Sequence, residues 1–403
     1  MSLPATLSEL GAAAVRRQSS LFDADCTAHG DAVTARVQGK RVLVVGGAGS
    51  IGSATTAQLA RFSPAQLHIV DTDENGLTEL VRDLRSQGIV SDKTELRTTP
   101  LDAGSPTMVR LLQDNHGYDL VLNFAAVKHV RSEKDVLSLL RMLDVNLRVT
   151  RRLLENVAGT SERYFAVSTD KAANPVNLMG ASKRAMEHLV LDEDLGIDVT
   201  SARFANVAFS QGSLLDGWLR RMAKRQPWAV PSSVKRFFVT LEEAGQLCLL
   251  AATVAPAGKV VIPDLDPATE LRDLVEVAHD VLAVFGLRPD FHDDEDSARK
   301  AAQSPRRGTW PVLVTRLDTA GEKDHEEFMA EGDVLQDVGF AALKALTVPT
   351  ADKAVLRAAL AEVEAVLADP NQPVDVASIT ALIARMVPEL DHRTSTLTLD
   401  TRM

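Results

Sequence analysis

The chain has 403 residues, a formal net charge of −11 and a hydrophobic fraction of 45%. This length and apolar content suffice for one large or two ordinary domains with proper cores. The acidic balance argues against nucleic-acid and membrane-surface binding, which need basic patches. Cys26 and Cys248 match no metal-ligand spacing, so we expect reduced thiols and no metal site. Without a signal peptide or an apolar run of ~18 residues, the chain is expected to be cytoplasmic and not bound to a membrane.

Residues 1–38 are expected to form an N-terminal extension. Leu7, Leu10, Ala14 and Val15 recur at helical spacing, and a polar stretch follows. Two interpretations are open, namely an arm that packs on a neighbouring subunit and a partly ordered leader.

Short apolar runs alternate with amphipathic segments between residues 39 and 205. Strands are predicted at Arg41–Val45, Gln66–Val70, Glu95–Leu101, Asp119–Phe124 and Tyr164–Val167. Helices are predicted at Ile51–Arg61, Leu77–Gln87, Thr107–Asn115 and Val136–Val157. Such alternation is typical of an α/β fold with a doubly wound parallel sheet.

The pattern is mixed from residue 206 to residue 346, with helices predicted at Leu214–Lys224 and Leu241–Val254. Residues 347–403 form a tail in which Lys353–Leu367 and Val376–Met386 read as amphipathic helices. These helices and the N-terminal extension offer apolar faces, either for contacts between subunits or for capping their own domain.

A glycine-rich turn follows the first predicted strand. Gly46, Gly49 and Gly52 permit a tight turn, close approach to a pyrophosphate and close packing of a helix on the strand. The helix predicted from Ile51 offers backbone N–H groups to phosphates, so Ser50 and Ile51 are also expected to contact the cofactor. The turn, with a strand before it and a helix after it, therefore predicts a dinucleotide site.

Asp71 stands at the end of the next strand, about twenty residues further on. Its carboxylate can accept both ribose hydroxyls but repels a 2′-phosphate, and neither Thr72 nor Asp73 supplies a cation. We therefore predict NAD over NADP as the cofactor. Asp102, after the third strand, is placed either to contact the adenine ring or to cap a helix.

A carboxylate and an amine, Asp170 and Lys171, follow the strand that ends at Val167. In short-chain dehydrogenases the lysine at the position of Lys183 closes a Tyr-x-x-x-Lys pair, but here the tyrosine position holds Met179. A thioether cannot act as an acid or base. Proton transfer is therefore assigned to Asp170 and Lys171.

The chain resembles the extended short-chain dehydrogenases and, within them, the polysaccharide-biosynthesis branch of UDP-N-acetylglucosamine 4,6-dehydratases. The likeness spans about residues 40–345 and is carried by GGAGSIGS at 46–53, NFAAVKHV at 123–130, STDKAANPVNLMGASKR at 168–184, RFANV at 203–207, KRFFVT at 235–240 and GEKDHEEF at 321–328. It implies a Rossmann-type domain at 39–205, a smaller substrate-binding region at 206–346 interleaved with it, and NAD held tightly. Methionine at the tyrosine position is a known variant in this branch.

The resemblance also implies roles for individual residues. Lys183 would hold the nicotinamide ribose, while Thr169 and Asp170 would contact the sugar, with Asp170 as the acid for the departing hydroxyl. Lys171 would remove the C5 proton beside a transient C4 ketone, if burial lowers its pKa. Further binding residues are expected at Ala125 for the cofactor and at Lys128, His129, Asn206, Ser213 and Arg236 for the substrate. Asn146 would fix the loop at 124–128 or simply be a buried asparagine.

Some segments that hold a nucleotide diphosphate in the family depart from its pattern. Gln211 replaces an arginine, and Leu317–Lys323 has one residue too many and lacks the matching arginine. An arginine–diphosphate contact is bidentate and charge-assisted, and neither glutamine nor aspartate replaces it. Arg236 and Arg316 could compensate in part.

The predicted function is the NAD-dependent dehydration of a nucleotide sugar similar to UDP-N-acetylglucosamine. The alternatives are the same reaction on a nucleoside or another sugar lacking the diphosphate, or epimerisation at C4 or C5. A non-catalytic NAD-binding regulator is less favoured, although Tyr118 and Tyr164, both at strand starts, cannot replace the missing tyrosine. The resemblance implies a homo-oligomer, a dimer or larger.

Overall fold

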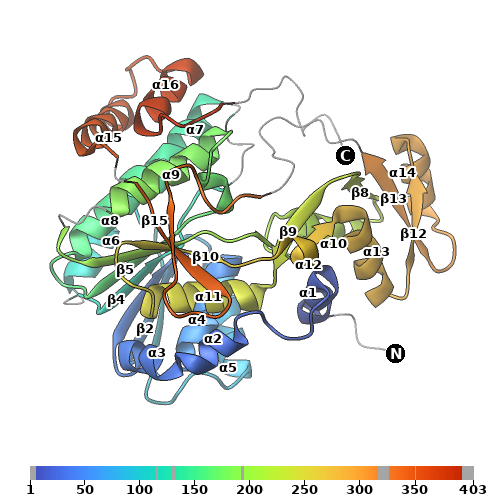
Figure 1. Cartoon of the computed structure of the whole chain (residues 1–403), viewed down its shortest axis with the longest axis horizontal. Helices are drawn as coiled ribbons and strands as arrows, with labels where there is room; N and C mark the ends of the chain where they lie inside the picture. Colours follow the sequence, from blue (N-terminus) through green and yellow to red (C-terminus); the bar gives the residue numbers. More distant parts are fainter. Residues whose placement is uncertain are drawn as a thin grey trace.

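The structure is a computed structural model that describes residues 6–114, 117–128, 133, 135–191, 195–315, 326–349 and 351–392. A nine-stranded sheet forms its centre (Figure 1). The order of its strands is β14 (Val334–Gln336), β15 (Leu343–Thr347), β10 (Lys259–Pro263), β6 (Asp198–Ala202), β5 (Arg163–Val167), β4 (Leu120–Asn123), β1 (Arg41–Val45), β2 (Gln66–Asp71) and β3 (Glu95–Pro100). Neighbouring strands from β10 to β3 are parallel, whereas β15 pairs antiparallel with β10 and β14 pairs antiparallel with β15.

Helices cover both faces of this sheet, so its central strands β1, β4 and β5 are mostly apolar and are buried at every position but Arg41. One face packs against α3 (Gly30–Val37), α4 (Ser50–Ala60), α5 (Glu74–Ser86) and α11 (Leu241–Thr253). The other face packs against α6 (Pro106–Asp114), α7 (Val136–Leu143), α8 (Thr150–Val157) and α9 (Leu178–Val190). The predicted α/β class and the five strand positions before residue 168 are confirmed.

The single helix predicted at Val136–Val157 is interrupted. A π-helical segment, η2 (Asp144–Val149), separates α7 from α8. Every residue of η2 except Arg148 is buried, so no exposed face marks the π turn in the sequence and periodicity alone could not reveal it.

A smaller α/β unit lies beside the large sheet (Figure 1). Its parallel sheet has the order β12 (Arg288–His292), β13 (Thr309–Thr315) and β8 (Trp228–Pro231). Its helices are α10 (Leu214–Ala223), α13 (Leu274–Val284) and α14 (Glu295–Gln303). A third sheet has three strands, in the order β11 (Leu271–Asp273), β9 (Lys235–Val239) and β7 (Asn206–Val207). The short helix α12 (Pro267–Glu270) precedes β11.

The N-terminal extension packs on its own chain. Helix α1 (Leu7–Val15) contacts α13 and β9, and α2 (Asp23–Ala28) leads into α3. Arg17, between α1 and α2, holds the extension to the rest of the chain. Its guanidinium pairs with Glu243 of α11 at 2.8 Å and also with Glu270 of α12. Within the described residues, therefore, the extension joins the small unit to the large one.

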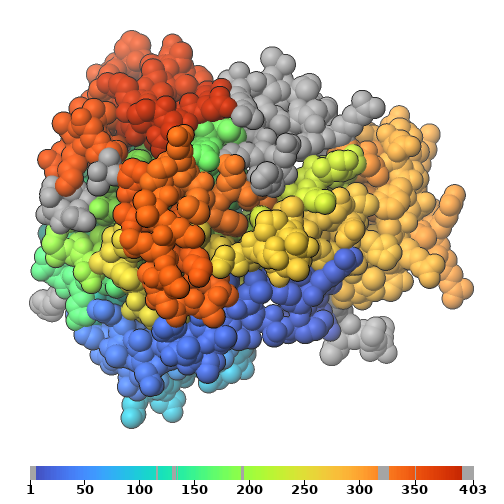
Figure 2. Space-filling model, in the orientation of Figure 1, coloured from blue at the N-terminus to red at the C-terminus, as the bar shows by residue number. Residues whose placement is uncertain are grey.

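The C-terminal helices α15 (Lys353–Ala368) and α16 (Val376–Met386) form one end of the molecule (red in Figure 2). They pack on α7, η2 and α9 and add their apolar side chains to the core on that face of the sheet. None of the helices in the described part of the chain combines the length and apolar character needed to cross a bilayer.

Candidate active site

A cavity of about 480 Å³ opens at the carboxyl ends of β1, β2, β4 and β5. The chain runs from β1 outward to β3 and then crosses to β4 on the other side of β1, and such switch points form ligand crevices in α/β sheets. The cavity brings together most of the predicted site residues. Those that line it are Gly46, Gly49, Ser50, Ile51, Gly52, Asp71, Asp102, Ala125, Lys128, Thr169, Asp170, Lys171, Lys183, Asn206 and Ser213.

The glycine turn has almost no room for side chains at two positions. Gly46 has φ +76°, and a Cβ there would lie 2.6 Å from the Ala125 nitrogen. A Cβ on Gly52 would lie 2.3 Å from the Gly46 oxygen, so glycine allows α4 to approach the turn this closely. Gly49 instead faces the cavity, with Gly46 as the one neighbour within 4 Å of an added Cβ.

Helix α4 points its N-terminus into the cavity. Its N-cap, Gly49, offers no side-chain acceptor to the first backbone N–H groups, and Ser50, Ile51 and Gly52 all line the cavity. Free N–H groups and the helix dipole together favour an anion at this place. This end of the cavity therefore fits the pyrophosphate of a dinucleotide.

Two carboxylates line the adjoining part of the cavity. Asp71 accepts hydrogen bonds from the backbone of Ala48 at 2.9 Å and of Asp73 at 3.0 Å, which fix its orientation beside the turn. Asp102 accepts from the Gly104 nitrogen at 2.8 Å and pairs with Arg141 at 3.2 Å. Arg141 also lines the cavity, and sequence reasoning missed it because it lies 39 residues beyond Asp102.

Asp71 leads us to expect that cofactor-stripped protein binds NAD at least about tenfold more tightly than NADP, a difference of ~1.4 kcal/mol. The reason is repulsion between the Asp71 carboxylate and a 2′-phosphate. Titration of both cofactors measures it, and Asp71→Asn should narrow the difference. Equal or tighter binding of NADP would contradict the assignment.

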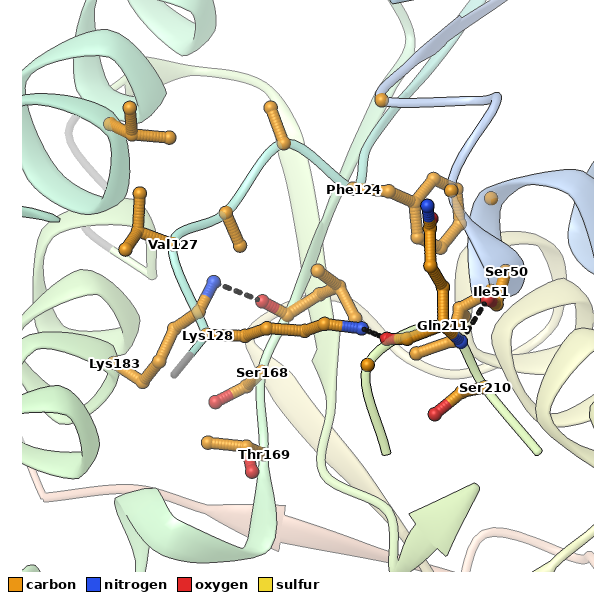
Figure 3. Close-up of a pocket in the computed structure, with 18 of the residues that line it drawn as sticks. Ser50, Ile51, Phe124, Val127, Lys128, Ser168, Thr169, Lys183, Ser210 and Gln211 are labelled. Carbon is orange, nitrogen blue, oxygen red and sulfur yellow. Dashed lines mark hydrogen bonds between the residues drawn. The ribbon is translucent and has the colours of Figure 1, made fainter. Parts of the chain in front are cut away.

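Two loops and the N-terminus of α4 meet at Gln211, as Figure 3 shows. The Lys128 ammonium donates to the Gln211 carbonyl at 2.9 Å, and the Gln211 N–H donates to the Ser50 hydroxyl at 2.8 Å. Burial lowers the pKa of Lys128, although the Asp216 carboxylate opposes this. Gln211, the departure from the family pattern, thus contributes its backbone to these contacts.

Asn146 fixes the loop at 124–128, as one of the two interpretations predicts. The side chain, fully buried in η2, accepts from the Val127 nitrogen at 2.9 Å and donates to the Val127 oxygen at 3.0 Å. It also donates to the Ser182 hydroxyl at 2.9 Å. The π-helical turn therefore holds the loop that carries Lys128.

Thr169, Asp170 and Lys171 form a hydrogen-bonded group just after β5. The Thr169 hydroxyl donates to Asp170 Oδ1 at 2.7 Å, and Lys171 Nζ lies 3.2 and 3.3 Å from the two Asp170 oxygens. Asp170 is 5% exposed, whereas the Lys171 side chain is 38% exposed. Both reach the cavity from the short 3₁₀ turn η3 (Asp170–Ala172).

The condition set for Lys171 as a base, a pKa lowered by burial, is not met in the ligand-free structure. Burial does act in that direction, but the carboxylates of Asp170 and Glu326 outweigh it and raise the pKa of Lys171 above its ordinary value. Lys171 is therefore a protonated partner of Asp170 in the ligand-free protein.

Lys183 and Met179 lie on α9, one helical turn apart, and both line the cavity. Lys183 Nζ donates to the Val167 carbonyl at 3.0 Å, and burial lowers the pKa of Lys183 to about 8. Tyr118 and Tyr164 are buried elsewhere, where their hydroxyls bond to His68 and to Asn123. As expected, neither tyrosine replaces the one missing at Met179.

The predicted substrate residues occupy different positions. Asn206 lines the cavity and donates to Glu326, while Ser213 lines it and caps α10 by accepting from the Asp216 nitrogen at 3.3 Å. Arg236 lies on β9 and pairs with Glu326 at 3.2 Å. Three further predictions, His129, Arg316 and Leu317–Lys323, fall outside the described residues.

A buried ionic network supports the loop that carries the candidate residues. Arg203 donates to both oxygens of Glu187, at 2.8 and 2.6 Å, and to Asp333 at 2.7 Å. Arg184 joins Asp333 at 3.0 Å, and the Ser168 hydroxyl donates to Glu187 at 2.6 Å. Sequence reasoning missed this network, although Arg203 lies in the segment RFANV and Arg184 in the segment STDKAANPVNLMGASKR.

A family model described as "Polysaccharide biosynthesis protein" matches residues 42–345. An uncharacterized membrane protein from Methanocaldococcus jannaschii, MJ1061, is 32% identical over 62% of this chain and 74% of its own length. The probable polysaccharide biosynthesis protein EpsC from Bacillus subtilis is 27% identical over 74% of this chain, which spans 53% of that relative. A UDP-N-acetylglucosamine 4,6-dehydratase (inverting) from Campylobacter jejuni is 25% identical over 62% of this chain and 75% of its own length.

Solved structures share the fold at lower identity. Pen from Bacillus thuringiensis superposes with a TM-score of 0.62 over 79% of this chain and 92% of its own, at 20% identity. The enzyme WbmF from Bordetella bronchiseptica, solved with NADH, gives a TM-score of 0.52 over 88% of this chain and 98% of its own, at 17% identity.

Proposed function

Because the chain belongs to the polysaccharide biosynthesis protein family, we propose that it is an NAD-dependent enzyme that dehydrates or epimerises a nucleotide sugar. The finer proposal is dehydration of a sugar similar to UDP-N-acetylglucosamine, by transient oxidation at C4, deprotonation at C5 and loss of the C6 hydroxyl. One observation carries it: the Asp170–Lys171 pair reaches the same cavity as Lys183, while Met179 occupies the tyrosine position. Such a site holds an acid and a base beyond what a simple dehydrogenase needs.

The cofactor assignment rests on the chain's own groups. The glycine turn and the N-terminus of α4 would hold the pyrophosphate, Asp71 the adenosine ribose, and Lys183 the nicotinamide ribose. Reversible hydride acceptance is the chemistry that a nicotinamide cofactor supplies when bound.

The pairing of Asp170 with Lys171 supplies both proton-transfer groups. Moving the proton from Nζ to a carboxylate oxygen 3.2 Å away gives a neutral amine and a neutral acid. The amine can then take the C5 proton, made acidic by a C4 ketone, while the acid gives its proton to the departing C6 hydroxyl, which leaves as water. Both groups return to their starting charges across this elimination, so that step takes up no proton from solvent and releases none. The sugar regains its hydride, with a proton equivalent to the one lost from the C4 hydroxyl, after the water has left.

Two other substrates or outcomes stay open. The lysine and arginine side chains that line the described part of the cavity are Lys128, Arg141, Lys171 and Lys183. Each already donates to a protein acceptor, and a diphosphate would have to compete for them. This supports, as the second candidate substrate, a nucleoside or another sugar lacking the diphosphate. In an epimerase, Lys171 could invert C5, or hydride could return to the other face of C4, without loss of water.

Mass spectrometry of the protein incubated with NAD and a panel of UDP-sugars and nucleosides tests these proposals. We expect a UDP-sugar to lose ~18 Da, the mass of one water, because the pair can both deprotonate C5 and protonate the leaving hydroxyl. Loss from a nucleoside alone would identify the second substrate class. A product of unchanged mass that is an isomer of the substrate would show that the enzyme is an epimerase and not a dehydratase.

A further inference from the structure

Glu133 is a carboxylate near the candidate site that the proton-transfer scheme does not use. It stands shortly after Lys128 in the chain, and its side chain is 13% exposed. Glu133 Oε1 accepts from the Met179 backbone nitrogen at 2.9 Å. Met179 lies in the first turn of α9, where backbone N–H groups need acceptors from outside the helix. A carboxylate at this end also interacts favourably with the helix dipole.

The first turn of α9 adjoins two groups of the candidate site. Lys183 follows Met179 by one helical turn, and both line the cavity. A Cβ on Gly180 would collide with the Lys171 carbonyl oxygen, so α9 packs directly against the backbone of η3. A displacement of the first turn of α9 would therefore shift both Lys183 and Lys171.

Residues 387–392 form the C-terminal segment that follows α16, and α16 itself packs on α9 (Figure 1). Two contacts attach this segment. The Glu389 carboxylate accepts from Arg184 Nε of α9 at 3.0 Å, and the Asp391 nitrogen donates to the Pro175 carbonyl, just before α9, at 3.1 Å. The match to the family model ends at residue 345, so the segment lies outside it.

These two contacts place His392 beside Glu133, where His392 Nε2 lies 3.7 Å from Glu133 Oε2. We propose that Glu133 is a positioning residue of the active site, which holds the first turn of α9 and is itself held by the C-terminal segment through His392. The inference rests on the proposed function only for its effect on turnover. The position of α9 and the binding of NADH can be measured without a substrate.

Glu133→Ala removes the acceptor of the Met179 N–H, whereas Glu133→Gln keeps an oxygen there and is the conservative variant. In Glu133→Ala, peptides that cover the first turn of α9 should exchange hydrogen about fivefold faster or more by mass spectrometry, as for a lost helix N-cap. NADH should bind less tightly to cofactor-stripped protein by fluorescence titration. We expect kcat to fall by about 10–100-fold, because small displacements of reacting groups reduce rates that much. Glu133→Gln should stay close to the unaltered protein in all three measurements.

His392→Ala tests the part played by the C-terminal segment. It should change the three quantities in the same direction as Glu133→Ala but by less, because the backbone contacts of the segment remain. Combined with Glu133→Ala it should add nothing, since effects that pass through one contact are not additive. His279→Ala is the matched control, with a side chain 59% exposed on α13, and should leave all three unchanged.

Unchanged exchange and NADH binding in Glu133→Ala would overturn the inference whether or not a substrate is known. Equal losses in Glu133→Gln and Glu133→Ala would overturn it too, as would faster exchange spread over the whole chain, which would indicate a general loss of stability. If His392→Ala behaved as the unaltered protein, or added its full effect to Glu133→Ala, the part of the C-terminal segment would be overturned. If the unaltered protein turns over no substrate, the proposed function has failed, and exchange and NADH binding still decide the inference.

Discussion

Replacing Lys171 by methionine should reduce turnover by about 10²–10⁴-fold or more, the usual contribution of a general acid–base group. Methionine matches the length of the lysine stem but can neither take the C5 proton nor reprotonate Asp170. The glycine turn, Asp71 and Lys183 are untouched, so NAD should bind as before. Single-turnover kinetics and cofactor titration on the same preparation measure the two effects.

A surface lysine provides the control for this change. Lys40 pairs with Glu162 at 2.6 Å, and its side chain is 31% exposed, so Lys40→Met removes the same charge away from the cavity. We expect normal turnover in that variant. Full activity of Lys171→Met would instead refute the assignment of Lys171 as the base.

Replacing Arg203 by methionine should lower the free energy of unfolding by about 3–5 kcal/mol, because it leaves buried carboxylates without their partner. Arg203, Glu187 and Asp333 each have fully buried side chains. Arg184 alone would then balance both acids. Urea unfolding at neutral pH, with the midpoint and slope analysed together, measures the loss.

An exposed ion pair provides the comparison. Arg152 and Glu364 lie 2.9 Å apart with side chains 55% and 37% exposed, and Arg152→Met should cost less than about 1 kcal/mol. If both variants lost equally little stability, the Arg203 network would not stabilise the fold as its burial implies. If Arg203→Met reduced activity but not stability, the network would instead serve to position Ser168, whose hydroxyl donates to Glu187.

The large domain was predictable because its elements are local. Predicted and observed strands agree to within a residue or two at β1, β2, β3, β4 and β5. Gly46, Asp71 and Asp102 mark the ends of the first three. Helices α2 and α3 were missed within a polar stretch, since Val33 and Val37 bury a narrow stripe against the sheet. Tertiary packing rather than periodicity determines such helices.

The site was predictable where a motif is contiguous in sequence. The glycine turn, the Asp170–Lys171 pair and Lys183 all reach one cavity. Glu326 was quoted only as part of a family segment, because its contacts with Asn206, Arg236 and Phe237 join distant parts of the chain that no spacing reveals. The direction of the pKa shift at Lys171 could not be predicted for the same reason, since Glu326 is one of the carboxylates that raise its pKa.

The order of strands in the large sheet has a consequence for synthesis on the ribosome. Strand β6 ends at Ala202, but its outer neighbour β10 begins at Lys259, and β15 follows only at Leu343. The edge of β6 has unpaired backbone groups until β10 emerges, and the edge of β10 has them until β15 emerges. An exposed edge of this kind is prone to pair with other chains. The nascent chain is therefore most exposed to misassembly while the smaller unit is being made.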